Sequence, residues 1–272
     1  NVVTLTATDS NGNVSSATAT VTVQDNIAPI VTITNDTVAL SAAGTAVITL
    51  DSIRVFSSDA CGIQSETLDS ANFDCSEVGL NTVTLTVTDS NGNATVLNAT
   101  VLVIDTIAPT ILVADDTLYL DATGSATLDT SLFDQGSFDN CGIASYVLSE
   151  TAFDCDSAGQ TLVIGLTVTD VNGNISTANV NITVLDTVSP VMAVQNIIVQ
   201  LDTFGNATID SSMIDNGTSD ACNIFTLTLS DTAFSCADVG VNVVTLTATD
   251  SNGNVSSATA TTLHHWHSVM IA

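Results

Sequence analysis

The feature that most restricts how this chain can fold is a phrase that returns at a constant interval along the sequence. TATDSNGNVSS occurs twice, and TVTDSNGNATV and TVTDVNGNIST occur once each. The aspartates of this phrase are evenly spaced: Asp9, Asp89, Asp170 and Asp250. Self-similarity at a fixed period, here about 80 residues, is the signature of a tandem array. A unit of this length is long enough to form a small domain with its own core.

A second phrase keeps the same period and marks the boundaries between units. QDNIAP, IDTIAP and LDTVSP place one aspartate shortly before each proline: Asp25, Asp105 and Asp186. The predicted division is therefore 1–25 (closing strands of a preceding repeat), 26–105, 106–186 and 187–261 (three repeats), and 262–272 (a non-repeat tail). We expect the third repeat to lack its closing strand, because TLHHWH interrupts the pattern. Residues 1–20 and 242–261 are identical, which suggests a window on a longer repetitive protein.

Alternating hydrophobicity predicts that the units are all-β. In TVTLTVT, Val83, Leu85 and Val87 alternate with threonines, so one face of the strand is buried and the other is exposed. Several such short strands and no helical period predict a tandem array of Ig-like antiparallel β-sandwich domains of about 80 residues. LYLDATGSATLD reads as a hairpin around residues 121–124. DSNGN reads as the turn between the last two strands, with its glycine at positive φ.

The charge balance excludes several classes of function. The chain has 29 acidic residues against one basic residue, Arg54, for a net charge of -28. Binding to nucleic acid or to an anionic membrane needs clustered Lys or Arg, so both partners are excluded. No apolar run reaches the length of a membrane span, so direct membrane insertion is not expected. Such an acidic chain should instead attract cations.

The cysteines repeat with the same period. They form three equally spaced pairs: Cys61 and Cys75, Cys141 and Cys155, Cys222 and Cys236. We expect three disulfides, one inside each repeat, each contributing roughly 3 kcal/mol in the loop-entropy model. Reduced thiols are the alternative, and a zinc site is disfavoured because no histidine lies near any pair. Disulfides predict an oxidising, extracellular compartment.

The phrase Asp-x-Asn-Gly-Asn has two interpretations. It is a turn, or it also offers oxygen ligands to calcium, which binds six to eight hard oxygens. The linker aspartates lie at the far end of the strand that leaves this turn, so they should meet the turn of the next repeat. The candidate calcium ligands are Asp25, Asp105 and Asp186 of the linkers, and Asp89, Asn91, Asn93, Asp170, Asn172 and Asn174 of the turns.

These residues support a resemblance to a known family. VTLTVTDSNGNATVLNATVLVIDTIAP, SSDACGI, SFDNCGI and TSDACNI resemble bacterial Ig-like and hyalin-repeat (HYR-like) domains, and look closest to the repeats of large Bacteroidota surface adhesins. The resemblance implies a secreted, surface-displayed stalk. It also implies O-glycans at Asp-Ser/Thr positions, for which the candidates are Thr37, Ser52, Ser70, Thr106, Thr117, Ser157, Thr187 and Thr232.

No catalytic motif occurs, so we expect no enzyme. The leading hypothesis is a structural segment of a cell-surface adhesin or stalk, in which stacked units form an extended rod. The alternative is a subunit of an extracellular filament that assembles end to end or by strand complementation. A third hypothesis, an adhesin whose loops grip an unknown surface ligand, is weaker because aromatic residues are only 4% of the chain. The expected partners are neighbouring repeats of the same protein.

Overall fold

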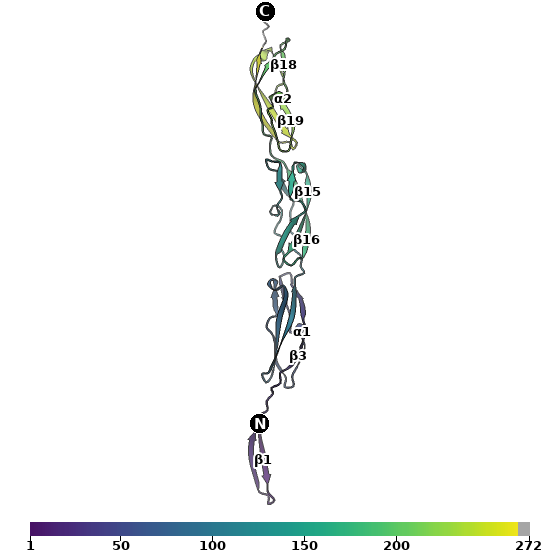
Figure 1. Cartoon of the computed structure of the whole chain (residues 1–272), viewed down its shortest axis with the longest axis vertical. Coiled ribbons are helices and arrows are strands. Elements are labelled where there is room, and N and C mark those ends of the chain that lie inside the picture. The colour runs from purple at the N-terminus through teal and green to yellow at the C-terminus, as the bar shows by residue number, and fades with distance from the viewer. Residues whose placement is uncertain (266–272) are drawn as a thin grey trace, which may run out of the picture. The chain divides into compact units, whose positions relative to one another are not determined.

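The computed structural model describes residues 1–265, and the prediction of a non-repeat tail therefore falls largely outside the described residues (Figure 1). Two compact units divide the chain. The first contains residues 1–108 with the loops 139–143 and 170–174, and the second contains the remainder. Each sequence repeat is a small β-sandwich, so the predicted all-β architecture of tandem sandwich domains is confirmed.

The first complete repeat pairs its strands into one sheet of four and two sheets of two. Its elements are β3 (Ile30–Ile33), β4 (Asp36–Ala39), β5 (Thr45–Val47), α1 (Leu50–Ile53), β6 (Arg54–Ser58), β7 (Ile63–Leu68), β8 (Asn72–Asp74), η1 (Cys75–Glu77), β9 (Gly79–Asp89) and β10 (Ala94–Ile104). The large sheet has the order β4-β10-β9-β7, with β4 parallel to β10. The small sheets are β3-β6 and β5-β8.

The next two repeats follow the same plan. The second contains β11 (Asp116–Tyr119), β12 (Ser125–Thr127), η2 (Thr130–Leu132), β13 (Ile143–Leu148), β14 (Ala152–Asp154), η3 (Cys155–Ser157), β15 (Thr161–Asp170) and β16 (Ile175–Leu185). The third contains β17 (Ile197–Gln200), β18 (Asn206–Thr208), α2 (Ser211–Ile214), β19 (Ile224–Leu229), β20 (Ala233–Ser235), η4 (Cys236–Asp238), β21 (Gly240–Asp250) and β22 (Val255–His265). Their four-stranded sheets are β11-β16-β15-β13 and β17-β22-β21-β19.

Period-two burial builds the cores as the sequence predicts. Val83, Leu85 and Val87 of β9 are fully buried, while the threonines between them are partly exposed. The buried residues of β10 and the short strands complete this core, which includes Ile53 and Phe73. The burial of these aliphatic faces is the main term that stabilises each sandwich.

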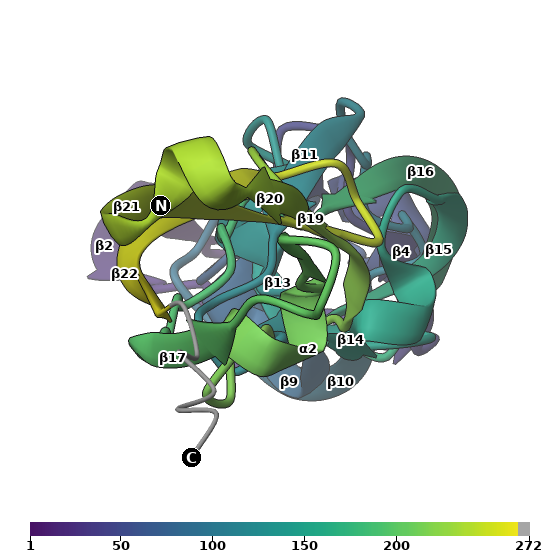
Figure 2. The same ribbon diagram turned by 90° about the horizontal axis from the view of Figure 1, so that it is seen from above.

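Two local expectations are wrong. The turn at Asp121–Gly124 exists, but β11 and β12 do not form a hairpin, since β11 pairs with β16 and β12 pairs with β14. The third repeat also has its closing strand. Strands β21 and β22 lie side by side (Figure 2), and β22 extends through the first residues assigned to the tail as far as His265. The repeat boundaries themselves stay a prediction.

Residues 1–25 contain a two-stranded hairpin of β1 (Val2–Thr8) and β2 (Val14–Thr20). Within the described residues this sheet has no third strand. All residues of both strands are exposed, including the apolar side chains of Val3 and Leu5.

Candidate cation sites and disulfides at the repeat junctions

The recurrence of the DSNGN turn along the chain has a structural cause. In the first complete repeat, Asp89 is fully buried, and its Oδ1 accepts hydrogen bonds from the backbone N–H groups of Asn91 and Asn93, both at 2.8 Å. Burial alone would raise the pKa of Asp89, but the hydrogen bonds from Asn93 and its neighbours outweigh burial and hold the pKa below its usual value. Asp170 behaves in the same way. Both turns therefore present a carboxylate that stays ionised.

The last asparagine of the turn connects each repeat to the linker that enters it. The Nδ2 of Asn93 donates to the carbonyl oxygen of Asp25 at 3.2 Å. The same bond recurs from Asn174 to Asp105 at 3.3 Å and from Asn254 to Asp186 at 3.2 Å. The linker aspartate thus lies against the turn of the repeat that follows it, where the sequence predicted it.

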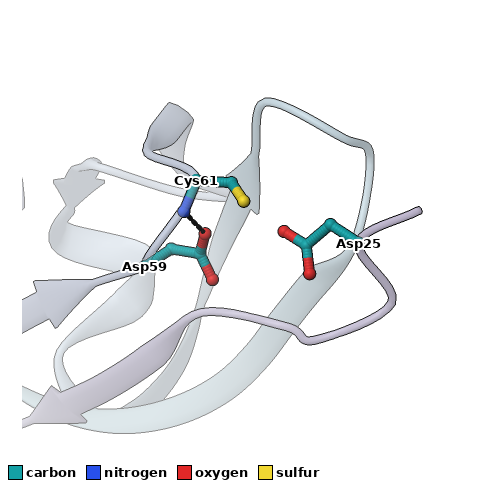
Figure 3. Close-up of side chains that lie close together, drawn as sticks. All are labelled: Asp25, Asp59 and Cys61. Atoms are coloured by element: carbon teal, nitrogen blue, oxygen red, sulfur yellow. Dashed lines mark hydrogen bonds between the residues drawn. The ribbon is translucent and has the colours of Figure 1, made fainter. Parts of the chain in front are cut away.

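A loop aspartate lies beside the linker aspartate at each junction. Its carboxylate comes from the loop SSDACGI, SFDNCGI or TSDACNI, as Asp59, Asp139 or Asp220. Asp105, Asp139 and Asp170 bring ligand atoms within 4.8 Å of one another. Asp25 and Asp59 form a similar group with Cys61, in which the Asp25 carboxylate faces Asp59 (Figure 3).

The third junction repeats this arrangement with Asp186, Asp220 and Cys222. Sequence reasoning missed Asp59, Asp139 and Asp220, although they recur with the period of the repeat, close to a cysteine.

The carboxylates at two junctions are buried without enough hydrogen-bond donors. Asp105 and Asp186 are 8% and 7% exposed. The buried side-chain oxygens without a partner include Asp105 Oδ2, Asp139 Oδ2, Asn140 Oδ1 and Asp186 Oδ2. Burial first, and then the charges of Asp186 and Asp250, raise the pKa of Asp220. Buried, unpaired carboxylates are costly, and a bound cation would remove that cost.

The donor set fits a hard divalent cation such as Ca²⁺, which prefers carboxylate and amide oxygens. The candidate ligands from the sequence do not all contribute equally. Asn91 and Asn172 are exposed and contact their aspartates through backbone N–H groups. Asn93 and Asn174 direct their Nδ2 atoms toward carboxylate and carbonyl oxygens. These four asparagines therefore position the aspartates, and the carboxylates of each junction are the candidate ligands.

The disulfides do not connect the predicted partners. Cys75 pairs with Cys141, and Cys155 pairs with Cys222, with Cα–Cα distances of 5.3 and 5.1 Å. Each bond therefore joins one repeat to the next, and the expectation of one disulfide inside each repeat is wrong. Cys61 and Cys236 are exposed and have no disulfide partner in residues 1–265. The neighbouring Asp25 carboxylate raises the pKa of the Cys61 thiol.

The disulfide and the acidic cluster share one loop. The Oδ1 of Asp139 accepts a hydrogen bond from the backbone N–H of Cys141 at 2.8 Å, and Asp220 holds Cys222 in the same way. The sulfur of Cys75 lies 3.4 Å from the carbonyl oxygen of Asn140 across the junction. The junctions that contain Asp139 and Asp220 thus each combine a disulfide with a cluster of carboxylates.

The fold and its junctions define the class of protein: a tandem array of β-sandwich repeats linked by disulfides. Hyalin from Strongylocentrotus purpuratus is similar to this chain, with 31% identity over 276 residues that cover 95% of the chain. The chain spans only 23% of the length of hyalin. This likeness supports the resemblance to Ig-like hyalin repeats. No protein-family model matches the chain.

Solved structures similar to this chain include segments of Sidekick-1 and of PcdhgB3. The immunoglobulin domains 1–5 of Sidekick-1 match 96% of this chain and 66% of that chain, with 8% identity and a TM-score of 0.38. The EC1-4 segment of PcdhgB3 matches 98% of this chain and 83% of that chain, with 14% identity and a TM-score of 0.35.

The candidate glycosylation positions differ in accessibility. Exposed side chains occur at Thr37, Thr106, Thr187 and Thr232, and half-buried side chains occur at Ser52, Ser70, Thr117 and Ser157. Thr106 and Thr187 follow the linker aspartates directly, outside any strand. In the described part of the chain, no helix is long and apolar enough to cross a membrane.

Proposed function

We propose that this chain is a structural segment of an extracellular adhesion protein, in which calcium and disulfides fix each repeat to the next. The observation that carries the proposal is the junction of the first two complete repeats, where the linker, loop and turn carboxylates of Asp105, Asp139 and Asp170 converge beside the Cys75–Cys141 disulfide. At the following junction, Asp186 and Asp220 lie beside the Cys155–Cys222 disulfide. The likeness to hyalin supports the assignment to an extracellular adhesion protein. Origin in a Bacteroidota surface adhesin stays a prediction.

Calcium supplies the charge that the junction lacks. Without a cation, the buried carboxylates of Asp105, Asp139 and Asp170 repel one another. A bound Ca²⁺ turns this repulsion into attraction between groups from the linker, the loop and the turn. Since these groups enter the junction from different segments, cation binding should restrict rotation about the linker. The proposed rod is therefore stiff in calcium and more flexible without it.

The cross-repeat disulfides add a constraint that does not depend on calcium. Each closes a loop with a sequence separation of 66 or 67 residues. In the loop-entropy model, a loop of this length contributes about 4 kcal/mol. A rod built this way keeps its repeats in register when calcium is removed, while losing stiffness at the acidic cluster.

Calorimetry of the whole chain tests the proposal. The melting temperature should rise when Ca²⁺ replaces EDTA, because a ligand at 100 times its Kd stabilises by about 2.7 kcal/mol for each site. Asp139→Asn should remove one bound Ca²⁺ in isothermal titration and reduce the rise. Asp156→Asn is the matched control, because Asp156 is an exposed aspartate outside every cluster. Equal melting temperatures in Ca²⁺ and EDTA would contradict the calcium part of the proposal.

Small-angle scattering tests the rod directly. The expected result is an extended particle whose maximum dimension is longer and better defined in Ca²⁺ than in EDTA. A compact particle in both conditions would reject the stalk function even if calcium binds.

A further inference from the structure

Two successive junctions differ in the residue that follows the loop aspartate. In the loops SFDNCGI and TSDACNI, Asn140 follows Asp139, whereas Ala221 follows Asp220. Both junctions lie between complete repeats, and each is closed by a cross-repeat disulfide. The amide of Asn140 is therefore a polar group that only one of these two otherwise similar junctions contains.

Asn140 adds a buried oxygen to the carboxylates of its junction. Three buried oxygens there have no hydrogen-bond partner within residues 1–265: Asp105 Oδ2, Asp139 Oδ2 and Asn140 Oδ1. The Nδ2 atom of the same amide donates to Asp105 Oδ1 at 3.2 Å, so the Asn140 side chain borders the acidic cluster directly. Asp105 is 8% exposed, and Asp170, the turn carboxylate of the cluster, is 2% exposed. Buried oxygens without donors are costly, and one shared cation satisfies all of them together.

The preceding repeat holds the backbone of Asn140 in place. The carbonyl oxygen of Asn140 lies 3.4 Å from Cys75 Sγ, and a Cβ added to Gly44 would lie 2.9 Å from the same oxygen. Gly44 also has a φ of +72°, so both the close contact and the conformation require glycine. The Nδ2 atom of Asn140 reaches the carbonyl oxygen of Ser41 at 3.4 Å. A side chain on a backbone fixed in this way loses little conformational freedom when it binds a cation.

The following junction brings fewer ligand oxygens together. Its group contains the carboxylates of Asp186 and Asp220, but the third member is Cys222, whose sulfur is bonded to Cys155. Among the described residues, this junction supplies one buried oxygen without a hydrogen-bond partner, Asp186 Oδ2. Calcium affinity depends on the number and charge of the ligand oxygens and on the rigidity of the site. The two junctions should therefore differ in their affinity for calcium.

We infer that Asn140 is a calcium ligand, and that it makes its own junction the tighter of these two calcium sites. This inference rests on the proposed calcium function and adds to it a ligand and an order of filling. The terminal torsion of asparagine is soft, so Oδ1 takes the place of Nδ2 beside Asp105 when the cation binds. Three carboxylates and an amide suit the high coordination number of Ca²⁺, whereas Mg²⁺ keeps several of its waters. As calcium rises, the junction that contains Asn140 fills first.

Hydrogen–deuterium exchange of the whole chain during a CaCl₂ titration tests the order of filling. Peptides that contain residues 139–143 and 170–174 report on the junction with Asn140, and peptides that contain 220–223 and 250–254 report on the following one. The first set should gain protection at a calcium concentration about tenfold lower than the second set. MgCl₂ at the same concentrations should protect the first set less than CaCl₂ does. Equal calcium midpoints for the two sets would overturn the inference.

Substitutions of Asn140 separate a ligand from a hydrogen-bond donor. Asn140→Ala removes the oxygen and should raise the calcium midpoint of the first set about tenfold, while the midpoint of the second set stays unchanged. Asn140→Asp keeps an oxygen at this position and should retain calcium binding. If Asn140 acted only as a donor to Asp105, the aspartate would lose binding as alanine does, and the inference would be wrong. Asn98→Ala, at an exposed position of β10 outside every acidic group, is the control and should change neither midpoint.

The following junction allows the reverse experiment. Ala221→Asn supplies the missing amide at an exposed position, so the substitution should not impair folding. The calcium midpoint of the second set should fall about tenfold, toward that of the first set. A wild-type chain that binds no calcium would overturn both this inference and the proposed calcium function. A chain that binds calcium but responds to neither Asn140→Ala nor Ala221→Asn would overturn this inference alone.

Discussion

A buried polar pair in β22, Thr262 and His264, leads to a prediction about stability and pH. The Oγ1 of Thr262 forms a hydrogen bond with the Nε2 of His264 at 2.8 Å, while the buried Nδ1 of His264 has no hydrogen-bond partner within the described residues. The double substitution Thr262→Val with His264→Val gives the third repeat the residues of the first, Val101 and Val103. The core should accommodate valine, because Phe234, whose ring centroid lies 4.1 Å from that of His264, corresponds to Phe73, which shares the core of the first repeat with Val101 and Val103. Removing the unsatisfied Nδ1 should stabilise β22 by about 1–3 kcal/mol near neutral pH.

The same substitution should remove a pH dependence. Burial, opposed only in part by the charge of Asp238, lowers the pKa of His264 below its ordinary value. Below pH about 6.5 the unfolded chain therefore binds a proton that the folded chain excludes. The wild-type chain loses up to about 1.4 kcal/mol for each pH unit as the pH falls below this value, and loses nothing above it. The stability gap between variant and wild type should widen at pH 5.5.

Hydrogen–deuterium exchange of a peptide spanning β21 and β22 measures this effect locally. After correction for intrinsic rates, the variant should exchange roughly 5- to 100-fold more slowly at pH 7.5, and the ratio should grow by up to about tenfold at pH 5.5. His265→Gln, at an exposed neighbouring position, is the control and should change neither ratio. If wild type and double variant lose protection equally on acidification, the reasoning about His264 is refuted.

Two other substitutions test the junctions. The double variant Cys75→Ser, Cys141→Ser should lower the free energy of unfolding by about 4 kcal/mol in urea denaturation. Cys61→Ser should change that free energy by less than about 1 kcal/mol. An equal loss in the two variants would instead support a disulfide inside the repeat, between Cys61 and Cys75. Gly124→Ala places a Cβ 2.6 Å from Cys155 Sγ, whereas Gly159→Ala meets nothing within 4 Å at a similar φ (+73° and +77°). Both variants lose stability because alanine disfavours a positive φ. Gly124→Ala should lose about 1–3 kcal/mol more of its free energy of unfolding, because its Cβ clashes with Cys155. Equal melting temperatures of the two variants would show that this junction is not tightly packed.

Local patterns predicted the parts of the fold that local physics decides. Alternating Val, Leu and Thr in β9 fixed which face is buried, and Asp89 with Asn91 and Asn93 fixed the turn. The partner strand of β11 could not be predicted from local patterns. The turn between β11 and β12 is local and was predicted, but β11 pairs with β16, which lies far along the chain.

The cysteines show the same limit. The short separation from Cys61 to Cys75 and the long one from Cys75 to Cys141 are equally regular in a periodic chain, so spacing alone favours no partner. The decisive fact is that the loop with Cys141 lies beside the η1 end of the preceding repeat. The linker and turn aspartates were accessible to sequence reasoning because strand direction places them at opposite ends of a repeat. Asp139 was not predicted as a candidate ligand, because its loop was interpreted only through the neighbouring Cys141, as part of a disulfide inside the repeat.

The cross-repeat bonds also determine how the chain carries mechanical load. Tension applied to the two termini passes from Cys75 directly to Cys141 and from Cys155 directly to Cys222, so the segments between these cysteines are bypassed. Those segments contain β9, β10, β15 and β16, the longest strands of the first two repeats. Pulling can extend them only after a sulfur–sulfur bond breaks. The corresponding strands of the third repeat, β21 and β22, have no such bypass within residues 1–265 and should yield first.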